Sequence, residues 1–85
     1  MKSFTYVIKD ELGIHARPAG LLVKEAKQFA SNITIACGQK EAVAKGLISV
    51  MGMAVKKGDK VVVTTEGEDE EEAIAALEAF FYANL

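Results

Sequence analysis

The chain is 85 residues long, which is too short for two domains. Residues 1–85 are therefore expected to form a single domain with a modest hydrophobic core. Apolar residues make up 51% of the chain and charged residues 26%, a balance typical of a soluble globular protein. The net charge of −2 argues against nucleic acid as a partner, and the absence of a run approaching ~20 apolar residues argues against direct membrane insertion. The single cysteine excludes an internal disulfide and, with no signal-peptide pattern, predicts a cytoplasmic protein.

Residues 3–9 alternate between two faces and predict the first strand. The face that carries Phe4, Tyr6 and Ile8 is expected to point into the core. Residues 10–13 (Asp-Glu-Leu-Gly) then form a loop, in which the glycine frees the backbone for a turn.

The loop leads into residues 13–18 (Gly-Ile-His-Ala-Arg-Pro), which contain the only histidine, His15, and the only proline, Pro18. Proline lacks an N–H group and suits the first turn of a helix. The apolar residues that follow are spaced for one buried stripe of a helix: Ala19, Leu22, Ala26 and Phe29. His15 is therefore predicted to lie at the N-terminus of a helix.

A histidine in this position has a chemical consequence. A helix N-terminus presents unpaired N–H groups and the positive end of the helix dipole, which together bind phosphate-like anions. Arg17 adds a planar fork of donors that suits phosphate oxygens. Neutral histidine is also a nucleophile that can hold a phosphoryl group covalently. The plainer alternative is that His15 caps the helix or is a solvated surface residue.

Residues 33–43 predict a β-hairpin. Ile33 and Ile35 alternate inward, Gly38 supplies the turn, and residues 40–43 form a short return strand. Cys37 lies just before the turn without a neighbour that would activate its thiolate, so we expect it to be a half-buried filler.

Residues 47–53 contain more apolar side chains than one buried face of a short helix accommodates. Some of them are therefore expected to be exposed, and an exposed apolar patch that contains methionine is typical of a site for several partners. The alternative is a short, fully buried core helix. The apolar residues in question are Leu47, Ile48, Val50, Met51 and Met53.

The last third of the chain predicts a turn over residues 56–59, a strand over residues 60–65 with Val61 and Val63 inward, and a helix from Glu70. The acidic run over residues 66–72 lacks the ligand spacing and turn glycine of a calcium-binding loop, so we expect no metal site there. Carboxylates interact favourably with the dipole at a helix start, which explains the run. The stripe that packs this helix on the sheet consists of Ala73, Ile74, Leu77, Phe80 and Phe81.

In chain order these elements read β-α-β-β-α-β-α. This order predicts an α+β fold, with a four-stranded, mainly antiparallel sheet and three helices on one face.

Residues 13–19 (Gly-Ile-His-Ala-Arg-Pro-Ala), followed by an apolar-striped helix in so short a chain, resemble the HPr family. These are the histidine-containing phosphocarriers of the bacterial phosphoenolpyruvate-dependent sugar phosphotransferase system. Residues 45–51 resemble the family's second functional segment, and Gly67 with the acidic helix start resembles its last third. The resemblance therefore runs essentially end to end and implies an open-faced β-sandwich.

The resemblance also implies a phosphoryl carrier rather than an enzyme, with Nδ1 of His15 as the phosphoryl acceptor. Arg17 would stabilise the phosphoryl group together with the helix N-terminus at Ala16 and Pro18. The chain has no phosphate-binding glycine loop, so we expect it to use no nucleotide or other cofactor itself.

The same resemblance implies a docking surface for enzyme I and enzyme IIA domains, which would bind transiently to a monomer. Its apolar part is Leu47, Ile48 and Met51, beside Ala16 and Gly20, and its basic rim is Arg17, Lys24 and Lys27. The two lysines fall on the side of the predicted helix opposite Leu22 and Phe29. Their plainer interpretation is a solvated helix face.

Two positions depart from the family pattern. Gly46 stands where HPr proteins of low-GC Gram-positive bacteria carry a serine that a dedicated kinase phosphorylates. Because glycine has no hydroxyl, regulation by phosphorylation at this position is excluded. Ser49 is the nearby hydroxyl, but a kinase reads a position as well as a hydroxyl, so we do not expect Ser49 to replace it. Gly46 is also expected to start the following helix less firmly than a capping serine. Leu12 stands where many members carry a small polar residue that reaches the site, and its effect on phosphoryl transfer stays open.

The function predicted from these residues is a relay, in which His15 takes a phosphoryl group from phosphorylated enzyme I and passes it to a sugar-specific enzyme IIA. Two alternatives stay open. One is an HPr-like regulatory protein in a nitrogen-type phosphorelay or with a transcription-factor partner. The other is an anion-binding or interaction module with an incidental histidine.

Overall fold

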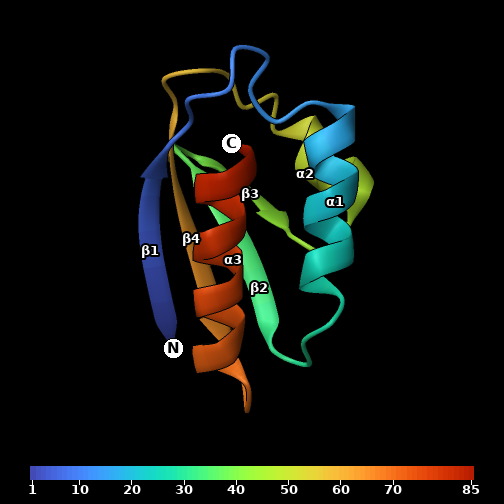
Figure 1. Cartoon of the computed structure of the whole chain (residues 1–85), viewed down its shortest axis with the longest axis vertical. Helices are drawn as coiled ribbons and strands as arrows, with labels where there is room; N and C mark the ends of the chain where they lie inside the picture. Colours follow the sequence, from blue (N-terminus) through green and yellow to red (C-terminus); the bar gives the residue numbers. More distant parts are fainter.

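The computed structural model describes residues 1–85, and its seven elements follow the predicted order. The strands are β1 (Lys2–Val7), β2 (Asn32–Cys37), β3 (Lys40–Val43) and β4 (Lys60–Glu66), and the helices are α1 (Ala16–Ala26), α2 (Leu47–Gly52) and α3 (Glu70–Asn84). Figure 1 shows the helices lying on one side of the sheet, which confirms the predicted α+β arrangement. None of the helices is long and apolar enough to cross a membrane.

The four strands form one antiparallel sheet in the order β1-β4-β2-β3. The central strand β4 pairs with β1 on one side, where Val63 lies opposite Phe4, and with β2 on the other, where Val63 lies opposite Ile35. The hairpin of β2 and β3 brings Ile35 opposite Ala42. A strand from the last third of the chain therefore joins the first strand to the hairpin.

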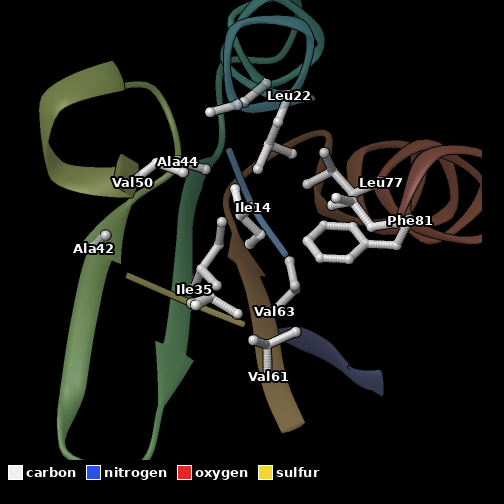
Figure 2. Close-up of a cluster of buried hydrophobic side chains, with 14 of the residues drawn as sticks. Ile14, Leu22, Ile35, Ala42, Ala44, Val50, Val61, Val63, Leu77 and Phe81 are labelled. Carbon is white, nitrogen blue, oxygen red and sulfur yellow. The ribbon is translucent and has the colours of Figure 1, made fainter. Parts of the chain in front are cut away.

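Alternation along the strands decides which side chains enter the core, as the sequence predicted. Ile35, Val61 and Val63 are fully buried, and Figure 2 shows them on the side of the sheet that faces Leu22 of α1 and Phe81 of α3. The ring of Phe81 is the centre of an aromatic group, because Phe4 and Tyr6 pack against it edge-on at centroid distances of 5.5 and 5.7 Å. The opposite face of the sheet has no helix on it.

Helix α1 ends earlier than its apolar stripe predicted. The stripe ran to Phe29, but the helix ends at Ala26 and Phe29 lies in the following segment, half-buried against the core. The N–H groups of Gln28 and Phe29 bond to carbonyls only three residues back, as in a tightening last turn. Lys45 then donates through Nζ to the Phe29 carbonyl oxygen at 2.6 Å, which fixes the chain as it leaves the helix.

The carboxylate of Asp69 holds the next part of this connection. It accepts hydrogen bonds from the N–H groups of Ala30 and Ser31, both at 2.9 Å, and from the Ser31 hydroxyl. The bond from the Ser31 hydroxyl is the largest cause that lowers the pKa of Asp69, and the bond from the Ala30 N–H adds to it. The N-cap residue of α3 is thereby tied to the segment that follows α1. The predicted acidic first turn of α3 is confirmed and consists of Glu70, Glu71 and Glu72.

Candidate functional site

The loop before α1 is shaped by a glycine in close contact with another segment. Gly13 has a φ of +67°, and a Cβ atom there would lie 2.2 Å from the Val55 carbonyl oxygen and 2.7 Å from the Lys56 Cα. The next residue, Ile14, donates its N–H to the same Val55 oxygen at 3.0 Å and buries its side chain. Glycine is therefore required where the loop rests on residues 55–56, and this contact sets the position of His15.

His15 is the N-cap residue of α1, as the sequence predicted. Its backbone is extended (φ −99°, ψ −176°), and its carbonyl oxygen accepts from the Ala19 N–H at 2.9 Å. The side chain makes no capping hydrogen bond, so the alternative that His15 serves as a side-chain cap is wrong. The imidazole is 34% exposed. A half-exposed ring thus lies next to first-turn N–H groups that no side chain caps.

The first turn of α1 offers donors to an incoming anion. The N–H groups of Ala16 and Arg17 have no partner within the helix, because such partners would lie before its start. Pro18, the third residue, is buried and has no N–H group to leave unpaired. The Arg17 side chain is exposed and belongs to none of the ion pairs, so its guanidinium is free to meet an anion at this helix start.

Asp10 approaches the imidazole, which the sequence did not indicate. Its Oδ1 lies 3.7 Å from Nε2 of His15 and accepts the Leu12 N–H at 2.8 Å. Aspartate often starts a turn in which its carboxylate accepts the N–H of the residue two positions later, so the sequence is compatible with this bond. The sequence does not indicate which way the carboxylate faces. The side chain of Leu12 itself is 70% exposed.

Helix α2 buries one side and exposes the other. Val50 is fully buried, while Leu47 and Met51 are each 41% exposed and Ile48 is 85% exposed. The expectation of partial exposure is confirmed, and the alternative of a fully buried helix is wrong. Leu47, Ile48 and Met51 form an apolar surface that we call the α2 patch. Because α2 packs beside α1, this surface lies next to the helix that His15 precedes.

The predicted rim on α1 is exposed along its length. The exposed residues are Ala16, Arg17, Gly20, Lys24 and Lys27, the last of which is the C-cap residue rather than part of the helix. Leu21 is 47% exposed on the same helix and was not predicted as part of this surface. The signal was present, because three consecutive apolar residues, 21–23, exceed one buried face, as residues 47–53 do.

Gly46 is the N-cap residue of α2 and provides no side-chain cap, in line with the expected weak start of this helix. A Cβ atom at this position would lie 3.3 Å from Oγ of Ser49, so the hydroxyl of Ser49 lies close to the place of the missing side chain. Ser49 is exposed and lines a shallow hollow between α2 and β3, together with Lys40 and Glu41.

Comparison with known proteins finds, over nearly the whole chain, the HPr family that the sequence resembles. Residues 2–83 match the family described as the PTS HPr component phosphorylation site. The phosphocarrier protein HPr of Mycoplasma capricolum is 43% identical over 77 residues, which cover 91% of this chain and 86% of the relative. The HPr of Lysinibacillus sphaericus is 46% identical over 77 residues, which cover 91% and 88%.

The fold agrees with the sequence match. A solved histidine-containing phosphocarrier protein, from work on the divergence of Mycoplasma from Gram-positive bacteria, superposes with a TM-score of 0.94 at 39% identity. The superposition covers 96% of this chain and 93% of that protein. The chain therefore belongs to the HPr family, the histidine-containing phosphocarrier component of the phosphotransferase system.

Proposed function

We propose that the chain relays a phosphoryl group from phosphorylated enzyme I to a sugar-specific enzyme IIA, through a phosphohistidine at His15. The relay serves phosphoenolpyruvate-dependent sugar uptake and takes place in the cytoplasm. The observation that carries this proposal is the half-exposed imidazole at the N-cap position, beside a first helical turn that no side chain caps. Membership of the HPr family supports it.

The chemistry follows from the groups around the ring. Nδ1 attacks the phosphorus of the donor, and the phosphoryl oxygens meet the N–H groups of Ala16 and Arg17 at the positive end of the helix dipole. The guanidinium of Arg17 is free to neutralise a second oxygen. These groups stabilise a phosphoryl group without supplying one, so the chain acts as a carrier between two proteins.

The α2 patch and the α1 rim form the proposed docking surface for both partners. Apolar contact with Leu47, Ile48 and Met51 supplies binding energy without a fixed geometry, which suits a surface that must release one partner before meeting the next. Lys24 and Lys27, which belong to no ion pair, favour an acidic partner surface and speed the encounter. The carrier acts as a monomer in this scheme.

The test is to incubate the protein with phosphoenolpyruvate and a bacterial enzyme I and to measure its intact mass. We expect the gain of one phosphate that is labile in acid, stable in alkali and absent from His15→Ala, since the chain has one histidine. Adding an enzyme IIA domain should then return the mass to that of the unmodified chain.

A standard HPr phosphorylated in parallel is the positive control. If that protein gains phosphate and this chain does not, the carrier proposal is refuted and an interaction module takes its place. If the chain gains phosphate but passes it only to a regulatory protein, the sugar-uptake part of the proposal is refuted while the carrier chemistry stands.

A further inference from the structure

We propose that Asp10 is a positioning residue for His15. Its carboxylate holds the imidazole in the tautomer that carries the proton on Nε2, and so leaves the lone pair on Nδ1 for attack on phosphorus. The inference rests on the phosphocarrier function proposed above and adds to it a residue outside the segment from His15 to Pro18. An aspartate that fixes the tautomer of a reacting histidine is a known arrangement in hydrolases.

The geometry singles out one ring nitrogen. Oδ1 of Asp10 lies 3.7 Å from Nε2, and the histidine side chain makes no capping bond through either nitrogen. A carboxylate accepts hydrogen bonds and donates none, so it favours the tautomer with a proton on the nitrogen that faces it. Both side chains are about one-third exposed, which leaves the ring room for the small rotation that a hydrogen bond of ordinary length requires.

The carboxylate of Asp10 is held in place by the loop. Oδ1 accepts the Leu12 N–H at 2.8 Å, the Asp10 carbonyl oxygen accepts the Gly13 N–H at 3.0 Å, and the Asp10 N–H donates to the main-chain oxygen of Leu85 at 2.9 Å. One hydrogen bond therefore holds the carboxylate, and two main-chain hydrogen bonds hold the backbone of Asp10. A carboxylate fixed in this way costs less ordering entropy to orient the ring than a free surface side chain would.

The neighbouring charges do not take over this role. Glu11 lies next in sequence, but its carboxylate bonds Nζ of Lys57 at 2.6 Å and is 81% exposed. Leu12 contributes no polar side-chain atom. Asp10 is thus the acidic group of this loop that faces the ring.

The transfer step explains why a negative charge at Nε2 is useful. The Nδ1 lone pair forms the bond to phosphorus while the bond between phosphorus and the donor atom breaks, and its electron pair leaves with the donor. The Nε2 proton stays in place, so the ring becomes a cation as the new bond forms. The carboxylate of Asp10 lies beside the nitrogen on which this positive charge appears. Transfer to the acceptor reverses these changes.

The test compares two aspartates that perform the same main-chain task. Asp10→Asn keeps an oxygen for the Leu12 N–H, removes the charge near the ring and replaces one acceptor oxygen by an NH2 donor. Asp59→Asn is the matched control, because the Asp59 carboxylate accepts the Lys56 N–H at 2.9 Å in the neighbouring loop and forms no pair with His15. Circular dichroism of both variants checks that they are folded.

The first readout is the tautomer of His15, measured from the nitrogen-15 chemical shifts of the ring in unphosphorylated protein at about pH 9, where an ordinary histidine is neutral. We expect the ratio of the Nε2–H to the Nδ1–H tautomer to fall about two- to fivefold in Asp10→Asn, the range for a half-exposed charge contact. Asp59→Asn should keep the wild-type ratio. Raising salt to about 1 M should shift the wild-type ratio in the same direction as Asp10→Asn, without any substitution.

The second readout is the rate of phosphate gain from phosphorylated enzyme I, which should fall by a similar factor in Asp10→Asn only. An unchanged tautomer ratio in Asp10→Asn, or an equal change in Asp59→Asn, overturns the proposal. The tautomer is measured without a phosphoryl donor. A chain that fails to accept phosphate therefore refutes the carrier function, whereas an unchanged tautomer in a chain that accepts phosphate refutes only the role of Asp10.

Discussion

The contact of Gly13 with residues 55–56 leads to a prediction with a built-in control. Gly13→Ala places a methyl group where the Val55 carbonyl oxygen lies 2.2 Å away, so the loop must move off this segment. Gly38→Ala introduces the same side chain at nearly the same backbone angle, with φ +62° against +67°, but meets no atom within 4 Å. The pair separates the cost of the angle from the cost of the contact.

The magnitude follows from what each alanine disturbs. A left-handed backbone costs an alanine about 1 kcal/mol relative to glycine, and this is the whole expected loss for Gly38→Ala. In Gly13→Ala the buried Ile14 also loses the 3.0 Å hydrogen bond to Val55, and a buried N–H group without a partner costs about 1–3 kcal/mol more. We therefore expect Gly13→Ala to lower the free energy of unfolding by about 2–4 kcal/mol.

Urea unfolding followed by circular dichroism measures both variants, and equal m-values would show that the difference lies in stability. Because the displaced loop carries His15, Gly13→Ala should also slow phosphate gain from enzyme I, whereas Gly38→Ala should not. Equal destabilisation by the two substitutions would refute the close contact, and normal phosphate gain by a destabilised Gly13→Ala would refute its role in positioning the histidine.

Three further predictions concern other parts of the chain. Ala54 has a φ of +52°, so Ala54→Gly should raise the free energy of unfolding by up to about 1 kcal/mol, and a decrease in urea unfolding would contradict this. The lowered pKa of Asp69 means that its charged form stabilises the fold above about pH 4 and that this stability is lost as pH falls through the lowered value. The midpoint temperature of thermal unfolding should therefore fall more steeply between about pH 5 and pH 2 in wild type than in Asp69→Asn. Parallel curves would count against a stabilising role of the Asp69 charge. Ile48→Ser, at an 85% exposed position, should weaken binding to enzyme I by about tenfold or more. It should change the free energy of unfolding by less than about 0.5 kcal/mol. The control Val7→Ser, 47% exposed on the helix-free face of the sheet, should leave this affinity unchanged, and equal losses would remove the α2 patch from the docking surface.

Local patterns predicted most of the elements because each pattern is a property of a few neighbouring residues. Period-two alternation gave the inward faces of β1, β2 and β4, and the acidic run placed the start of α3. The end of α1 was wrong because partners far along the chain decide it. Lys45 binds the Phe29 carbonyl across 16 positions, and Asp69 binds Ala30 and Ser31 across 39 and 38 positions. A short sequence window that tests helical periodicity around residues 26–31 contains neither Lys45 nor Asp69.

The candidate site shows the same division. The place of His15 at a helix start follows from Pro18 and the apolar stripe behind it, which are adjacent in sequence. The approach of Asp10 to Nε2 depends on how the loop folds back, and this is set by contacts of Gly13 and Ile14 with Val55, some 40 residues away. The exposure of Leu21 could have been predicted from the sequence. The argument from an excess of apolar residues, which predicted the exposure of the α2 patch, applies to residues 21–23 as well.

The strand order has a consequence for the emergence of this protein from the ribosome. Both the amino-terminal strand and the hairpin pair with β4, which begins only at Lys60. During synthesis β1 therefore stays unpaired until β4 has been made. Only the hairpin of β2 and β3 can form earlier. The non-local pairing predicts slow folding for a chain of this size, because loop-closure entropy is lost before the contacts that repay it are made. The pairings that join β1 and the hairpin into one sheet therefore form only after residues 60–66 are synthesised, and the contact of Ile14 with Val55 forms only after residue 55. A nascent chain truncated before Val55 is thus expected to lack both the assembled sheet and the contact that positions the proposed phosphoryl site at His15.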